Sequence, residues 1–275
     1  MKSILLPTDF SDNAWSAAVY ALKLYEKSEC TFYFINSCKT EVSVMSNMSN
    51  KLLNVMKESA MKELLELKRM ARIANANEKH NFEIILSSDN IVDAINRSIK
   101  THNIDMVVMG TKGASKTKEI FFGSNTVKVL KKVKSSAILV VPDEFNYVVP
   151  AQIAFPTDYN RLYDDKELDP LKKLASVHNS KIRILHIEVE KKLNDIQEQN
   201  IKMLDENLVN FEHSFHWMPD YDKKASVIQD FIDELNINIL AMVNHRHSFI
   251  EKIISEPVIK TIGFHSKVPF MVIPE

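Results

Sequence analysis

Short apolar runs alternate with longer stretches of helical periodicity along the first half of the chain. The short runs predict buried strands, and apolar residues recurring every three or four positions predict amphipathic helices. This alternation is typical of βαβ units and indicates an α/β fold with a parallel sheet. We expect strands over residues 2–6, 31–37, 81–87, 105–109 and 136–141, and helices over residues 11–27, 51–75, 89–101 and 124–134.

The same pattern begins again in the second half. AQIAFPTD at residues 151–158 repeats ILLPTD at residues 4–9, and VPFMVIP at residues 268–274 repeats SAILVVP at residues 136–142. Between them we expect two strands and the long helix of the first half again, over residues 181–187, 237–243 and 192–210. Such a duplication predicts two tandem domains, over residues 1–146 and 147–275.

Composition places the chain among soluble globular proteins, with 45% hydrophobic and 26% charged residues. The formal net charge of -1 gives no overall attraction to nucleic acid or to an anionic membrane, so we expect neither partner. No apolar run has the roughly 18 residues of a membrane helix, and the first residues do not resemble a signal peptide, so we expect a cytoplasmic protein. Cys30 and Cys38 lie at opposite ends of a predicted strand and should be free thiols.

Glycine is the most informative residue type, because the chain has only four and three of them fall at Gly110, Gly113 and Gly123. This segment leaves the carboxyl end of a predicted strand and enters a predicted helix, which is where open parallel sheets bind ligands. Main-chain N–H groups at a helix N-terminus attract phosphate, and Lys112 places a cation beside them. The spacing fits neither the Walker pattern nor the dinucleotide fingerprint. A purely structural βα loop is the alternative.

Three motifs resemble the universal stress protein family, in its tandem two-domain form. They are the glycine motif with Ser124 directly after Gly123, the segment Pro7-Thr8-Asp9 after the first strand, and Val140-Val141-Pro142 at the last strand. The resemblance covers residues 1–142 and, more weakly, residues 151–275. It implies two doubly wound domains, each with a five-stranded parallel sheet in the order 3-2-1-4-5 and helices on both faces.

The resemblance also implies an adenine-nucleotide site in the first domain, for ATP or for ADP or AMP. Ser37 would offer main-chain contacts to adenine, and Asp9 would lie by the ribose or by a phosphate-bound Mg²⁺. The implied binding residues are Pro7, Thr8, Asp9, Ser37, Met109, Gly110, Lys112, Gly113, Gly123, Ser124 and Asn125. Asn36 and Ser88 depart from the family, which often has His and Gly there. Thr8 and Asp9 are also good turn residues, so a structural role is the alternative for both.

The second half has lost the glycine motif. Asn244, His247 and Pro257 replace the three glycines, and Val258 replaces the serine. Proline has no N–H to offer a phosphate, so we expect no ATP in this degenerate second domain. We expect Arg161 to pair with the nearby Asp158, a structural contact.

Three functions fit these residues. The first is a stress-response or regulatory protein that binds an adenine nucleotide in its N-terminal domain. The second is a slow ATP hydrolase using the same site, although no catalytic constellation is recognisable. The third is a scaffold or interaction module. Duplication suggests that the two domains pair within one chain, and it leaves a further homodimer open.

Overall fold

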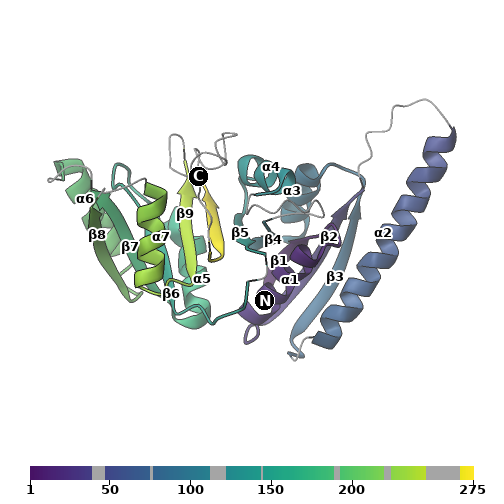
Figure 1. The fold of residues 1–275 in the computed structure, drawn as a ribbon, viewed down its shortest axis with the longest axis horizontal. Helices are drawn as coiled ribbons and strands as arrows, with labels where there is room; N and C mark the ends of the chain where they lie inside the picture. The colour runs from purple at the N-terminus through teal and green to yellow at the C-terminus, as the bar shows by residue number, and fades with distance from the viewer. Residues whose placement is uncertain are drawn as a thin grey trace. The chain divides into compact units, whose positions relative to one another are not determined.

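The computed structural model describes residues 1–38, 47–74, 77–111, 122–143, 145–188, 193–219, 224–245 and 267–275. The chain divides into two compact units, Met1–Glu144 and Phe145–Glu275. Each unit is a sheet of parallel strands with helices packed against it (Figure 1).

The first unit alternates strands and helices throughout. Its strands lie in the order β3-β2-β1-β4-β5, and every described pairing among them is parallel. Right-handed crossovers then put α1 and α2 on one face of the sheet and α3 and α4 on the other. The elements are β1 (Lys2–Pro7), α1 (Asp12–Leu24), β2 (Cys30–Ser37), α2 (Asn47–Ala74), β3 (His80–Ser87), α3 (Ile91–His102), β4 (Met106–Gly110), α4 (Ser124–Lys132) and β5 (Ala137–Val141).

The second unit repeats this order. Its strands lie as β8-β7-β6-β9-β10, which is the same topology counted from its own first strand. The elements are β6 (Gln152–Pro156), α5 (Asp165–His178), β7 (Lys181–Glu188), α6 (Asp195–Asn207), β8 (His213–Pro219), α7 (Lys224–Glu234), β9 (Ile239–Asn244) and β10 (Phe270–Pro274).

The predicted fold class is confirmed, since each unit has a five-stranded parallel sheet in the order 3-2-1-4-5. Most predicted elements begin or end within three residues of the observed ones; the largest difference is at α2, which begins at Asn47 rather than at residue 51. The residues of α5, β8 and α7 carry no predicted element. Cys30 and Cys38 are free thiols, as expected. Among the described residues, no helix combines the length and the apolar character that crossing a membrane requires.

Several helices begin at a side chain that accepts a hydrogen bond from the first turn. Ser11 caps α1, Asn90 caps α3, Asp164 caps α5 and Asn194 caps α6. Each cap satisfies one of the N–H groups that have no partner within the helix, a contribution of about 1 kcal/mol. The strand-to-helix junctions of both units are therefore set largely by local sequence.

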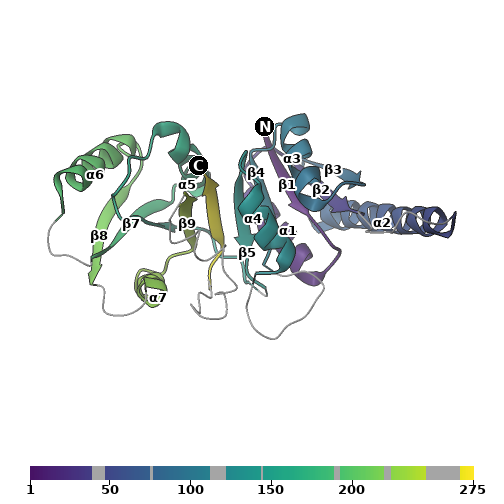
Figure 2. The ribbon, with the colours of Figure 1, turned by 90° about the horizontal axis from the view of Figure 1, so that it is seen from above.

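The α2 helix packs on the sheet with only part of its length. Leu64 is fully buried and Ala60 nearly so, whereas Leu52 and Leu65 are more than half exposed. The helix lies along β3 and reaches out past the strands at the outer edge of this unit (Figures 1 and 2). Its attachment therefore depends on a short buried stripe in its C-terminal half.

The neighbouring leucines of α2 test this attachment, because the same substitution meets two different environments. We expect Leu64→Ala to lower the free energy of unfolding of the first unit by about 2–5 kcal/mol, through lost burial and a residual cavity. Leu65→Ala, at 53% exposure, should change it by about 0.5 kcal/mol or less. Chemical denaturation followed by circular dichroism compares the two. Equal effects would contradict the described packing of α2.

Candidate functional site

The β1 strand lies between β2 and β4 and ends at the switch point of the first unit's sheet. Ile4 and Leu5 pair with Met106 and Val107 of β4 on one side, and all of β1 pairs with β2 on the other. The helix after β1 and the helix after β4 lie on opposite faces, so their loops diverge from this point. The carboxyl ends of β1, β2 and β4 therefore border one site.

The loop after β1 is a tight turn held by its own side chains. The Thr8 hydroxyl accepts the N–H of Phe10 at 3.0 Å, and Phe10 has a φ of 67°. Asp9 Oδ1 accepts the Ser11 N–H at 3.2 Å and the Ser11 hydroxyl at 2.6 Å. Thr8 and Asp9 thus have the structural roles that the sequence left as alternatives. Asp9 is nevertheless exposed and remains accessible to a ligand.

Asn36 fixes the end of β1 to β2. Its amide nitrogen donates to the Thr8 carbonyl at 2.8 Å. His186 has the equivalent position in the second unit, where its Nδ1 lies 3.0 Å from the Thr157 carbonyl. Asn36 departs from the family by residue type, but it makes the contact that the histidine makes in the other unit.

Ser37 presents main-chain groups to the side of the sheet where β1 has ended. The Ile35 carbonyl accepts the Thr8 N–H on the β1 side, and the Cys38 N–H donates to the Ser87 carbonyl on the β3 side. Main-chain groups alternate between the two neighbouring strands, so those of Ser37 face the β1 side. The paired part of β1 stops at Pro7, opposite Ile35. The position of Ser37 therefore suits main-chain contacts to a planar ring.

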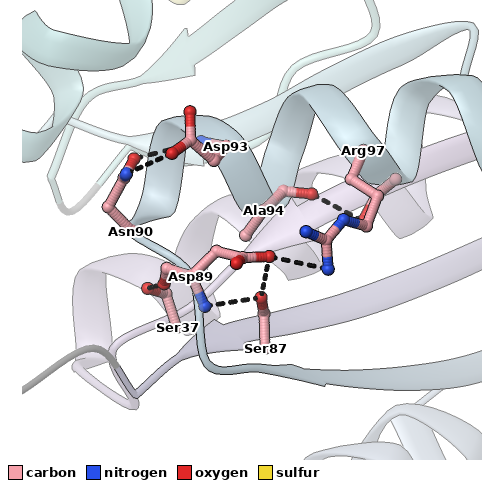
Figure 3. A network of polar contacts seen from close by, with 8 residues as sticks. Ser37, Ser87, Asp89, Asn90, Asp93, Ala94 and Arg97 are labelled. Carbon is pink, nitrogen blue, oxygen red and sulfur yellow. Dashed lines mark hydrogen bonds and ion pairs between the residues drawn. The ribbon is translucent and has the colours of Figure 1, made fainter.

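A network of polar side chains holds Ser37 against the loop before α3 (Figure 3). The Ser37 hydroxyl donates to the Asp89 carbonyl at 2.6 Å. Asp89 in turn accepts a bond from the Ser87 hydroxyl at 3.2 Å and pairs with Arg97 at 2.8 Å. Ser88, where the family often has glycine, is not among the residues with positive φ. The backbone of this loop therefore does not require glycine at that position.

Gly110 is explained by packing. A Cβ at this position would lie 2.1 Å from Asn13 Oδ1 and 3.0 Å from the Asn13 carbonyl oxygen. Asn13 is buried on α1, and its amide donates to Asp143 at 3.2 Å. The φ of Gly110 is not in the positive range, so the backbone conformation does not require glycine here. The absence of a side chain lets α1 approach the end of β4.

Two hydrogen bonds join the ends of the glycine segment. The Gly123 N–H donates to the Thr111 carbonyl at 2.6 Å, and the Thr126 hydroxyl donates to the Gly110 carbonyl at 3.1 Å. Thr111 is 5% exposed, and its hydroxyl has no hydrogen-bond partner among the described residues. The end of β4 and the start of α4 are thereby held together.

Among the described residues, no side chain caps the start of α4 at Gly123, unlike the starts of α1, α3, α5 and α6. Its first turn also carries no acidic residue. Ser124 and Asn125 are exposed on that turn. The N–H groups of this turn therefore retain hydrogen-bonding capacity for an anion.

The remaining expected site residues divide into buried and undescribed ones. Pro7 ends β1 and Met109 lies within β4, and both are buried. Lys112 and Gly113 lie outside the described residues. The described part of the chain contains no group of three or more His, Cys, Asp or Glu residues that could hold a metal ion.

The equivalent edge of the second unit differs at β9. Ile4 pairs with Met106 and Ile153 with Ile239, so the register makes Val243 the counterpart of Gly110. The expectation that Asn244 replaces Gly110 is therefore wrong by one residue, and Asn244 corresponds to Thr111. In this register Ile104 matches Ile237 and Met109 matches Met242, so the sequence does carry the signal that gives the correct alignment. His247, Pro257 and Val258 lie outside the described residues.

The turn after β6 keeps its conformation but buries an aromatic ring. Tyr159 has a φ of 57°, as its counterpart Phe10 does at 67°. Its ring is 1% exposed and stacks on His186 with centroids 4.8 Å apart. Burial raises the pKa of the Tyr159 hydroxyl.

Arg161 pairs with Glu167 at 2.8 Å, so the expected pairing with Asp158 is wrong. The Asp158 carboxylate instead accepts the Asn160 N–H at 3.0 Å, as Asp9 accepts that of Ser11. Because this main-chain hydrogen bond already engages the Asp158 carboxylate, Arg161 pairs instead with the half-buried Glu167 carboxylate of α5.

Comparison with known proteins places the first unit in a family. The model of the universal stress protein family matches residues 1–142. No curated protein matches the sequence. A universal stress protein from Archaeoglobus fulgidus DSM 4304 is 19% identical, covers 99% of this chain and 96% of its own, and superposes with a TM-score of 0.69.

Two further solved structures extend the comparison. A functionally unknown protein from Pseudomonas aeruginosa PAO1 is 8% identical over 100% of this chain and 92% of its own, with a TM-score of 0.58. A universal stress protein solved in complex with cAMP is 19% identical over 51% of this chain and 96% of its own, with a TM-score of 0.37. At these identities the first and second structures support the fold alone, and the third is too distant in superposition to inform the site.

The contact between Gly110 and Asn13 gives a test by double-mutant cycle. We expect Gly110→Ala to lower the free energy of unfolding by about 1–3 kcal/mol, because Asn13 must move to admit a methyl group. In an Asn13→Ala background the same change should cost less, because the nearest atoms are gone. Thermal and chemical unfolding of the four proteins measure the coupling. Additive effects would contradict the packing explanation.

Proposed function

Because this chain belongs to the universal stress protein family, we propose that its first unit binds an adenine nucleotide, with ATP as the leading ligand, at the carboxyl edge of β1, β2 and β4. The proposal rests mainly on one observation: hydrogen bonds bring the end of β4 and the uncapped start of α4 together at the sheet's switch point. N–H donors with no partner among the described residues suit a phosphate group.

The donor groups at this edge fit the parts of such a ligand. The first turn of α4 offers N–H groups and the Ser124 hydroxyl to phosphate oxygens, with Asn125 beside them. Gly123 has no side chain to obstruct that approach. Ser37 offers main-chain groups to the adenine edge, and Asp9 is exposed on the loop between the two regions. The buried Thr111 hydroxyl is a further donor at the base of the segment.

Magnesium would enter with the phosphates. The described carboxylates and histidines form no three-residue metal site, so Asp9 is the residue proposed to contact a phosphate-bound Mg²⁺. Hydrolysis would further require a positioned base. Asp9 Oδ1 already accepts two hydrogen bonds from Ser11, which favours a binding role over a catalytic one.

The second unit is proposed to bind no nucleotide. The turn after β6 buries the ring of Tyr159. Val243 occupies the position of Gly110, whose missing side chain lets α1 pack closely in the first unit. We further propose that nucleotide occupancy of the first unit is the signal of a cytoplasmic stress-response or regulatory protein. Pairing of the two units within the chain, and of two chains as a homodimer, belong to the same proposal.

Ligand-induced stabilisation tests the site directly. With nucleotide at about 100 times Kd, the first unit should gain about 2.7 kcal/mol, a rise in Tm of roughly 5–10 °C. Differential scanning calorimetry with ATP, ADP, AMP, cAMP and GTP, each with and without Mg²⁺, identifies the base and the phosphate requirement. An unchanged Tm with every nucleotide would favour the scaffold function.

Two variants locate the ligand within the chain. Gly123→Val should fold, since φ -60° and ψ 155° suit any residue, yet it should lose the nucleotide-dependent rise in Tm because its side chain obstructs the first turn of α4. Asp9→Asn should weaken the response, whereas Asp158→Asn, the same change at the equivalent turn, should leave it intact. Equal responses in the two Asn variants would place the ligand elsewhere. ATP turnover that Asp9→Asn abolishes would favour the hydrolase.

A further inference from the structure

The charge of the chain is divided unequally between its two units. Residues 1–144 hold 20 Lys and Arg against 16 Asp and Glu, whereas residues 145–275 hold 15 against 20. The net charge of -1 therefore conceals a first unit of +4 and a second unit of -5. An asymmetry of this kind points to an anionic partner for the basic part.

The positive excess comes from one short segment. No acidic residue stands between Glu119 and Asp143, and the four lysines of that interval are Lys128, Lys131, Lys132 and Lys134. Without these four lysines the first unit would be neutral, with 16 basic and 16 acidic residues. We call these four residues the α4 lysine face.

All four lysines are exposed, and they lie on α4 and the turn after it. The buried residues of α4, Thr126, Val129 and Leu130, lie on its other side. Among the described residues, no carboxylate forms an ion pair with Lys128, Lys132 or Lys134. Near the start of the adjacent α3, Asp89 pairs with Arg97, and the Asp93 carboxylate accepts a hydrogen bond from the Asn90 side-chain amide.

We propose that the α4 lysine face docks the phosphate backbone of duplex nucleic acid without reading its sequence. Lysine contacts phosphates as a point charge and gives little base specificity. Single-strand binding relies on exposed aromatic rings, and the described residues of the first unit include no exposed aromatic side chain. Membrane docking relies on apolar anchors, and the described residues of α4 expose none. This surface is independent of the proposed base and ribose contacts.

Fluorescence anisotropy of a labelled 24-base-pair duplex of arbitrary sequence, titrated with the full chain in the absence of nucleotide, tests the proposal. Three phosphate contacts, from Lys128, Lys132 and Lys134, predict a slope of about -2.7 for log K against log salt, or an affinity loss of roughly 40-fold between 50 and 200 mM salt. The triple variant Lys128→Glu, Lys132→Glu, Lys134→Glu should bind at least 30-fold more weakly at 50 mM salt.

A matched control separates the surface from total charge. Lys51→Glu, Lys62→Glu, Lys79→Glu makes the same charge change at exposed positions elsewhere in the first unit, and it should alter binding less than threefold. Circular dichroism confirms that both variants are folded. Equal losses in the two variants would overturn the proposal, as would absence of duplex binding at 50 mM salt. Binding to vesicles containing phosphatidylserine but not to the duplex, or salt-sensitive self-association lost in the α4 variant without duplex binding, would also overturn it.

Discussion

The hydrogen bond from the Gly123 N–H to the Thr111 carbonyl is the contact on which the first unit's edge depends. A loop that leaves a strand and returns as a helix can end anywhere within its reach unless something fixes its two ends. Here the end of β4 and the start of α4 are joined at 2.6 Å, and the Thr126 hydroxyl adds a second bond to the Gly110 carbonyl. The first turn of α4 consequently lies at the switch point, where β1 also ends.

Duplication kept the framework of this edge and changed its contents. Both units place Thr and Asp after the first strand, both hold the next residue at positive φ, and both secure the threonine carbonyl from the second strand. The Asn36 amide contacts the Thr8 carbonyl in the first unit, and the His186 imidazole contacts the Thr157 carbonyl in the second, so each carbonyl has a hydrogen-bond partner. The two units differ in how deeply the aromatic residue at this positive-φ position is buried. Phe10 is only half-buried, whereas Tyr159 is fully buried against His186.

The secondary-structure elements could be predicted from the sequence because local hydrophobic patterns and helix caps determine most of them. Apolar strands, Ser11 as a cap, and the repeated Pro-Thr-Asp segment predicted most element positions and the duplication, whereas the strand order was implied by the family resemblance. Prediction failed where a residue's role is set by a neighbour distant in sequence. No local pattern reveals that Asn13 fills the space beside Gly110. The pairing of Arg161 with Glu167 spans only six residues, and it was missed because Asp158 lies nearer in the sequence. The one-residue error at Val243 has a different origin, since Ile104 and Met109 match Ile237 and Met242 in the observed register and this signal is present in the sequence.

Helix stability explains the positions of some lysines of α4 but not of others. Cations in a last turn interact favourably with the helix dipole, by about 0.3–1 kcal/mol each, which accounts for Lys131 and Lys132. Lys128 lies in the middle of the helix and Lys134 lies beyond its end, where that interaction is weak. The first turn has no side-chain cap among the described residues, and its exposed N–H groups can bind an anion in place of water. Helix stability alone therefore does not explain why α4 has exposed N–H donors in its first turn and lysines over the rest of its exposed face. Binding of anions, as proposed for both regions, would explain the two features together.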